Sequence, residues 1–252
     1  MIYIVLIIAV AAILLVGFSS RHKNSQMYLF SGVVFSYTLM IFFFLFYLCK
    51  DTFHLNTFLE YFPMPRQIIL IFYSLGISKL TILSLLNLSA TLFILVNVLF
   101  VMSFATGLSQ NLRRCIYALS MLYAGLQAFI FNPYVYKWLY SLLYPNHYSS
   151  MQVKSFFSML SQVSNLLNCV ILIVCAVSLI FFTLRSPNIK IFRLSLLSVS
   201  ISYSMLVFSF IFFFRNLPGQ LIRYSKISDI VTYQELSSIA QMHTYQYFPY
   251  IV

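Results

Sequence analysis

Charged residues are scarce in this sequence: Asp, Glu, Lys and Arg together make up only 8% of its 252 residues. Soluble domains contain about 25% charged residues and about 45–50% apolar ones. Hydrophobic residues reach 62% here, more than a soluble core of this size could bury. The composition therefore excludes an ordinary soluble domain and predicts an integral protein of the cell membrane.

Acidic residues and histidines are rarer still, with four of each, and all lie outside the long apolar segments. Ion-coupled transporters and proton relays keep such groups inside the bilayer, so neither function is expected. A retinal protein would need a lysine in mid-span, whereas Lys79 lies at the beginning of its segment. The sequence also lacks a Gly-rich phosphate loop, a His-Glu-x-x-His zinc helix and a Gly-x-Ser-x-Gly elbow. We therefore expect no enzyme within this chain, no cofactor and no metal site.

The four cysteines do not form the pattern of a disulfide framework. Cys169 and Cys175 lie inside one apolar segment, while Cys49 and Cys115 lie at the ends of two others. We therefore expect the cysteines to pack against neighbouring side chains and not to form disulfides.

Most of the sequence consists of long apolar segments. The length of each is close to the roughly 20 helical residues that cross a bilayer core of about 30 Å. No linker rich in Pro, Gly or Ser divides them. The sequence therefore predicts an all-α fold, a polytopic transmembrane helix bundle that forms a single domain over residues 1–252. A further apolar stretch, 246–252, predicts the start of a seventh span. The six full spans are predicted at 2–18, 27–49, 80–105, 115–131, 156–184 and 194–214.

Basic residues give a formal charge of +11, but they are scattered between apolar segments and not gathered on one polar surface. They therefore indicate membrane topology, and no nucleic-acid partner is expected. The short connections 19–26, 106–114 and 185–193 hold seven basic residues and no acid, whereas the longer connections hold all four acids. By the positive-inside rule, the short connections are cytoplasmic and the N-terminus lies outside.

Amide side chains inside a predicted span mark a candidate ligand site, because an amide in lipid needs a hydrogen-bond partner. Gln162, Asn165 and Asn168 repeat every three residues in the outer half of the segment 156–184. Their spacing is typical either of a pocket that opens outward or of hydrogen bonds between helices. Tyr134 and Trp138 are further candidates because they lie on an aromatic outer segment, although interfacial belts use the same residues.

Short basic inner connections, longer outer segments, an N-terminus outside and an apolar C-terminal end together resemble the multi-span sensor region of bacterial membrane histidine kinases. The resemblance implies signal transduction in a two-component system, a peptide or small amphipathic ligand at the outer face, and a homodimer. It also implies that the sequence is the membrane part of a longer protein whose kinase domain lies outside these residues.

Two other functions fit the same topology. Six spans in 252 residues is also the size of an exporter permease subunit, although such permeases usually begin with a cytoplasmic amphipathic segment and this chain begins with a span. An accessory subunit of a membrane complex needs neither a ligand nor a catalytic residue. In all three cases the lipid bilayer is the main partner.

Overall fold

The computed structural model describes residues 25–50, 71, 74–105, 107–143, 149–185 and 190–227. All regular secondary structure in this part of the chain is helical. The helices are α2 (Ser25–Lys50), α5 (Lys79–Phe104), α6 (Gln110–Ile130), α7 (Pro133–Leu143), α8 (Ser149–Leu184), α9 (Lys190–Phe214) and α10 (Leu217–Ile227).

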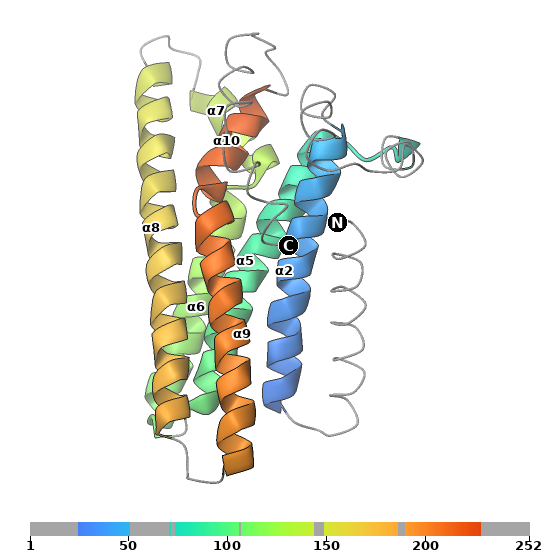
Figure 1. The fold of residues 1–252 in the computed structure, drawn as a ribbon. Coiled ribbons are helices and arrows are strands. Elements are labelled where there is room, and N and C mark those ends of the chain that lie inside the picture. Colours follow the sequence, from blue (N-terminus) through green and yellow to red (C-terminus); the bar gives the residue numbers. More distant parts are fainter. Residues whose placement is uncertain are drawn as a thin grey trace.

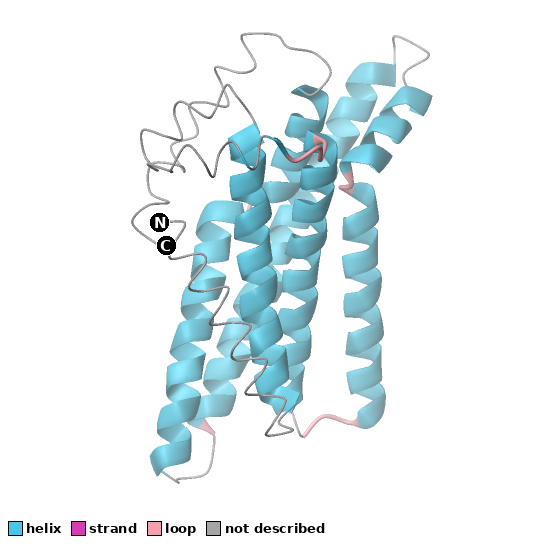
Figure 2. Ribbon diagram, turned by 90° about the vertical axis from the view of Figure 1, so that its right-hand side faces the viewer, coloured by secondary structure: helices cyan, strands magenta, loops and turns pink. Residues whose placement is uncertain are grey.

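The long helices α2, α5, α6, α8 and α9 run side by side along one axis (Figures 1 and 2). The short helices α7 and α10 lie together at one end, called the upper end below. At the opposite, lower end, α5 passes into α6 and α8 passes into α9. The helix ends that flank the basic connections 106–114 and 185–193 therefore lie at the same end of the bundle.

Four helices of the described residues are long and apolar enough to cross a membrane, with spans at Ser25–Tyr47, Lys79–Phe104, Ser155–Leu184 and Leu196–Ile222. The first three match the predicted spans 27–49, 80–105 and 156–184. The fourth matches the predicted span 194–214 and extends it through a turn into α10.

The predicted span at 115–131 corresponds to α6, which qualifies only together with the start of α7, as a pair bent by 64°. The described residues therefore contain four spans, or five if this bent pair counts as one. The predicted first span, 2–18, and the apolar stretch 246–252 lie outside the described residues. Six full spans and an external N-terminus stay predictions.

Local hydrogen bonds explain where α5 begins and ends. The Ser78 hydroxyl accepts a hydrogen bond from the Thr81 backbone N–H at 3.1 Å, which caps the N-terminus of α5. At the lower end, Arg113 Nη2 donates to the Ala105 carbonyl at 2.7 Å. A cation at this position stabilises the negative end of the helix dipole and holds the start of α6 against the end of α5.

The central helix is α5, which contacts α2, α6, α7, α8 and α10. Its sequence is apolar around the whole circumference, and a helix of this kind is stable when neighbours surround it. Leu83, Leu86 and Phe93 have no exposed surface. The closest neighbour is α2, where a Cβ atom added to Gly32 would lie 3.2 Å from Val96 Cγ1. The missing side chain therefore lets the two helices approach closely.

Aromatic rings connect α9 to this pair. Phe210 of α9 stacks on Phe93 of α5 with ring centroids 5.1 Å apart, and Phe93 lies 5.4 Å from Tyr37 of α2. The Tyr37 hydroxyl is hydrogen-bonded to the Ser209 hydroxyl, and both groups are buried. The core of α2, α5 and α9 is thus held by ring packing and by the hydrogen bond between Tyr37 and Ser209.

We expect Gly32→Leu to destabilise the bundle by about 1–3 kcal/mol, because the new side chain overpacks the contact between α2 and α5. Gly125→Leu is the matched control, since Gly125 lies on α6 and a Cβ there meets nothing within 4 Å. Both variants gain the same helix propensity. Thermal unfolding in detergent should show a lower Tm for the first variant only. Equal Tm values would contradict the close approach at Gly32.

A double-mutant cycle should detect the bond between α2 and α9. Tyr37→Phe and Ser209→Ala each remove one partner, and we expect a coupling energy of about 0.6 kcal/mol, with an upper range of about 1.7 kcal/mol. The measurement is the free energy of unfolding of the wild type, both single variants and the double variant. Strict additivity would show that the two hydroxyls do not interact.

Candidate functional site

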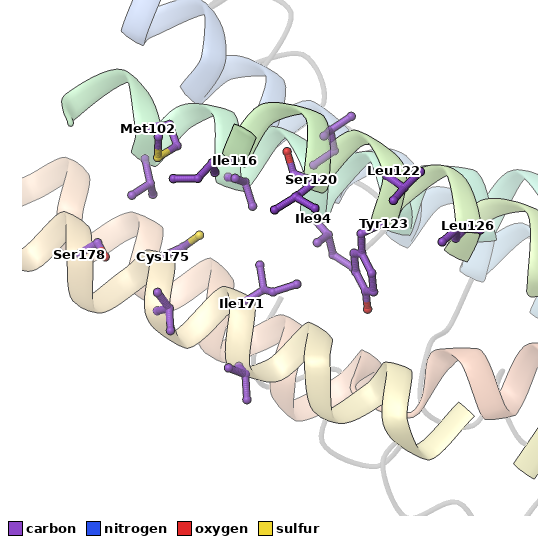
Figure 3. A pocket seen from close by; sticks show the side chains of 16 residues that line it. Ile94, Met102, Ile116, Ser120, Leu122, Tyr123, Leu126, Ile171, Cys175 and Ser178 are labelled. Atoms are coloured by element: carbon purple, nitrogen blue, oxygen red, sulfur yellow. The ribbon is translucent and has the colours of Figure 1, made fainter. Parts of the chain in front are cut away.

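A cavity of about 700 Å³ lies between α6 and α8, with α5 as its floor. Ile94 of α5, Ile116 and Tyr123 of α6, and Ile171 and Cys175 of α8 are among the side chains around it (Figure 3). Although α6 and α8 run next to each other, they pack on α5 more closely than on one another. The cavity is the space left between the two outer helices.

The cavity opens at the side of the bundle. Leu122 of α6 and Val174 of α8 both line it, yet 61% and 57% of their surfaces are exposed. None of the described residues that line the cavity is charged. Ser120 Oγ donates to the carbonyl of Tyr117 at 3.0 Å, so this polar lining group is satisfied within its own helix. The opening is therefore apolar and lies along the membrane-spanning length of the helices.

The Tyr123 hydroxyl joins the two walls of the cavity. The Tyr123 hydroxyl donates to Asn168 Oδ1 at 2.6 Å, and a longer contact of 3.5 Å reaches the Ser164 carbonyl. Asn87 of α5 donates to the Ala128 carbonyl of α6 at 2.9 Å at a similar height. These bonds hold α5, α6 and α8 together in the upper half of the bundle.

Two amide oxygens near this level have no hydrogen-bond partner. They are Oε1 of Gln127, whose side chain is 5% exposed, and Oδ1 of Asn165. Gln127 follows Tyr123 by one helical turn on α6, and Asn165 precedes Asn168 by about one turn on α8. We call Tyr123, Gln127, Asn165 and Asn168 the amide cluster.

The three amides predicted as one stripe occupy different environments. Asn168 is 2% exposed and bonded to Tyr123, Asn165 is half-buried, and Gln162 is exposed. Three residues turn a helix by about 300°, so positions six residues apart differ by about 120° around its axis. The helix rotation therefore places Asn168 inward and Gln162 outward. Asn168 takes part in the predicted bonding between helices, while a ligand role for these residues stays a prediction.

The aromatic candidates lie on α7, away from the cavity lining. Tyr134 is exposed, and its hydroxyl is hydrogen-bonded to Thr81 Oγ1 at 2.7 Å and to Ser78 Oγ at 3.1 Å. It thereby attaches α7 to the N-terminus of α5. Trp138 is 57% exposed on the same helix. The structure does not bring either residue to the amide cluster, and their predicted ligand role is untested.

Sequence reasoning did not single out Ser120 and Tyr123 of α6 as candidate site residues. Ser120, Tyr123 and Gln127 form a polar stripe at helical spacing within the apolar segment 115–131, and this pattern could have revealed it. The hydrogen-bond partners of these residues could not have been found in this way.

The described cysteines are free thiols. Cys175 is buried and lines the cavity, Cys169 is partly buried, and Cys115 is exposed. Among the residues that the structure describes, no three His, Cys, Asp or Glu side chains are grouped so that they could hold a metal ion.

Comparison of this sequence and structure with known proteins does not identify a family. Searches of protein-family models, of curated proteins and of solved structures find no match to this chain. The candidate site is therefore defined by its geometry.

Substitutions at Asn168 and Gln162 should change the free energy of unfolding differently, because Asn168 faces inward and Gln162 faces outward. Asn168→Leu removes the acceptor of Tyr123 and should lower the free energy of unfolding by about 0.6–1.7 kcal/mol. Gln162→Leu should leave it unchanged or raise it slightly, because an exposed amide is replaced by an apolar side chain on the lipid side. The same unfolding assay measures both variants. Equal effects would show that the stripe shares one environment.

Proposed function

We propose that this chain is the membrane-embedded receptor region of a signalling protein and that it binds a membrane-partitioned ligand in the cavity between α5, α6 and α8. The supporting observation is the cavity itself. Its volume of about 700 Å³ falls within the range of about 300–1,000 Å³ that is usual for ligand sites. In a bilayer its side opening meets lipid tails, so a ligand dissolved in the membrane enters without crossing water.

A ligand in this position can act as a wedge. It contacts α6 and α8 together, and it therefore binds more tightly to an arrangement in which they are separated than to one in which they close. Only such a difference in affinity shifts a population of conformations. The lower end of α8 leads into α9, which is bound to α2 through Tyr37 and Ser209. This path carries a change at α8 to the rest of the bundle.

The proposal keeps the topology expected from the sequence, with six full spans, the start of a seventh, an external N-terminus and a cytoplasmic lower end. Arg113, Arg114 and Arg185 lie at that end, and no acid occurs in its short connections. The output domain belongs to the cytoplasmic side and lies outside this chain. By the same resemblance to histidine-kinase sensor regions, the working state is a homodimer.

A variant that fills the cavity tests this function. Ser120→Phe places a ring in the cavity, and Ala118→Phe is the matched control because Ala118 is exposed on α6 and outside the lining. The probe is an alkyl diazirine without a polar head, in phosphatidylcholine nanodiscs that contain the full chain. We expect labelling of cavity residues to fall about tenfold in Ser120→Phe, equivalent to about 1.4 kcal/mol, and to stay unchanged in Ala118→Phe.

Equal labelling in the two variants would reject the cavity as a ligand site. Cross-links from the cavity to a helix of a co-purified protein, with no probe labelling, would favour the accessory subunit. A Tm measurement on both variants confirms that each is folded.

A further inference from the structure

We infer that the ligand is an amphipathic molecule with one aliphatic chain and an anionic head, and that Arg113 and Arg185 bind this head at the lower end of the cavity. A phosphate or a carboxylate head meets this description. The inference rests on the proposed function, because it assigns chemistry to the ligand of the same cavity.

The lower limit of the cavity is formed by one residue from each of its three helices. These residues are Met102 of α5, Ile116 of α6 and Ser178 of α8. Figure 3 shows the three side chains at one end of the cavity and Leu126 at the other. Groups that lie one helical turn beyond Met102, Ile116 and Ser178 are therefore next to the lower limit of the cavity.

Arg113 places a guanidinium group at this level. It precedes Ile116 by three residues on α6, and three residues correspond to about 4.5 Å along the helix axis. Its Nη2 donates to the Ala105 carbonyl at 2.7 Å, and Ala105 follows Met102 by three residues on α5. The side chain is half-buried, so part of its surface stays accessible. The hydrogen bond to α5 thus holds a cation one turn below the lining.

Arg185 places a second guanidinium group at the corresponding level of α8. Its guanidinium carbon lies over the ring of Phe181, 5.9 Å from the centroid, and Phe181 is one turn closer to the cavity. Val174, Phe181 and Arg185 lie on one face of α8, and all three are exposed. The open side of the cavity, where Val174 belongs to the lining, therefore continues as exposed surface to Arg185. A ligand in the cavity reaches this cation along that surface.

The charges at this level favour an anionic head. The connections 106–114 and 185–193 contain no Asp or Glu, and the residues that the structure describes contain none either. Arg113 and Arg185 therefore have no acidic partner within the described part of the chain. A guanidinium group binds carboxylate and phosphate through paired, charge-assisted hydrogen bonds. An anionic head compensates both charges, whereas an ammonium head would add a third positive charge.

The lining itself determines the apolar part of the ligand. Tyr123 is the only aromatic residue among the described residues of the lining, and most of the others are aliphatic. Ile116 and Leu126 are separated by ten residues of α6, which correspond to about 15 Å along the helix axis. This is half of a hydrocarbon core of about 30 Å, the thickness of one leaflet. A single aliphatic chain that extends through the lower leaflet therefore matches the lining when its head lies at the two arginines.

Two probes that differ only in the head test the inference. One is a long-chain alkyl phosphate with a diazirine in its chain, and the other is the alcohol with the same chain. With the full polypeptide in phosphatidylcholine nanodiscs, we expect the phosphate to label cavity residues at about tenfold lower concentration than the alcohol. In Arg185→Gln this preference should fall to about threefold or less, because one of the two cations is removed. Labelling by the alcohol should persist, which shows that the cavity is intact.

Arg114→Gln is the matched control, because it removes the same charge at the same end of the bundle. Arg114 lies on the side of α6 that includes Ala118, and both residues are exposed and outside the lining. This variant should keep the tenfold preference. An equal loss of preference in Arg114→Gln and Arg185→Gln would show a general effect of surface charge and overturn the inference.

Equal labelling by phosphate and alcohol in the wild type would also overturn the head-group inference, and it would leave the proposed function standing. Labelling by neither probe would overturn both. If Arg185→Gln loses labelling by the alcohol as well, Arg113→Gln replaces it, and a tenfold preference that survives in Arg113→Gln rejects the inference.

Discussion

The packing of neighbouring helices on α5 is the interaction on which the rest of the structure depends. Lipid tails are as apolar as the side chains, so helices in a bilayer associate through close packing and hydrogen bonds and not through the hydrophobic effect. The central helix provides both. Phe93 and Phe100 supply rings, and Asn87 supplies a hydrogen bond to α6. Each of the helices α2, α6 and α8 is therefore placed by its contact with α5.

The two sides of α5 are packed differently, and this difference produces the site. On one side, Gly32 allows α2 to approach, and the rings of Tyr37 and Phe210 fill the space between helices. On the other side, the bond from Tyr123 to Asn168 sets the separation of α6 and α8, and small side chains such as Ser120 leave a cavity below it. An aromatic core therefore lies next to a pair of helices that is packed less closely and encloses the cavity.

The sequence predicted helices correctly where apolar length alone decides the outcome. The segments 27–49, 80–105 and 156–184 are long apolar runs, and each corresponds to a helix that satisfies its own backbone. For the segment 115–131, apolar length did not decide whether the helix is a complete span. The helix α6 begins with polar and basic residues, and the chain bends by 64° between α6 and α7, which starts at Pro133. Whether such a pair counts as one span depends on its geometry and not on its hydropathy.

The candidate site was predicted only in part for a related reason. The repeat of Gln162, Asn165 and Asn168 is visible in the sequence, but a spacing of three residues drifts around the helix axis and does not show which member faces inward. Their partners are also distant in the chain. Tyr123 and Asn168 are 45 residues apart, and Tyr37 and Ser209 are 172 apart. A local sequence pattern cannot identify hydrogen-bonded residues that are so far apart in the chain.

By itself, the sequence determined that the chain forms helices long and apolar enough to span a membrane. In hydrocarbon every backbone group must be paired, and an apolar helix achieves this with neighbours four residues away. The sequence also determined that the described spans contain no acid or histidine. Only the tertiary structure decided the rotation of α8, the bond across its interface with α6 and the cavity between them. These features depend on the fit of side chains from separate helices, and that fit exists only after the helices have packed.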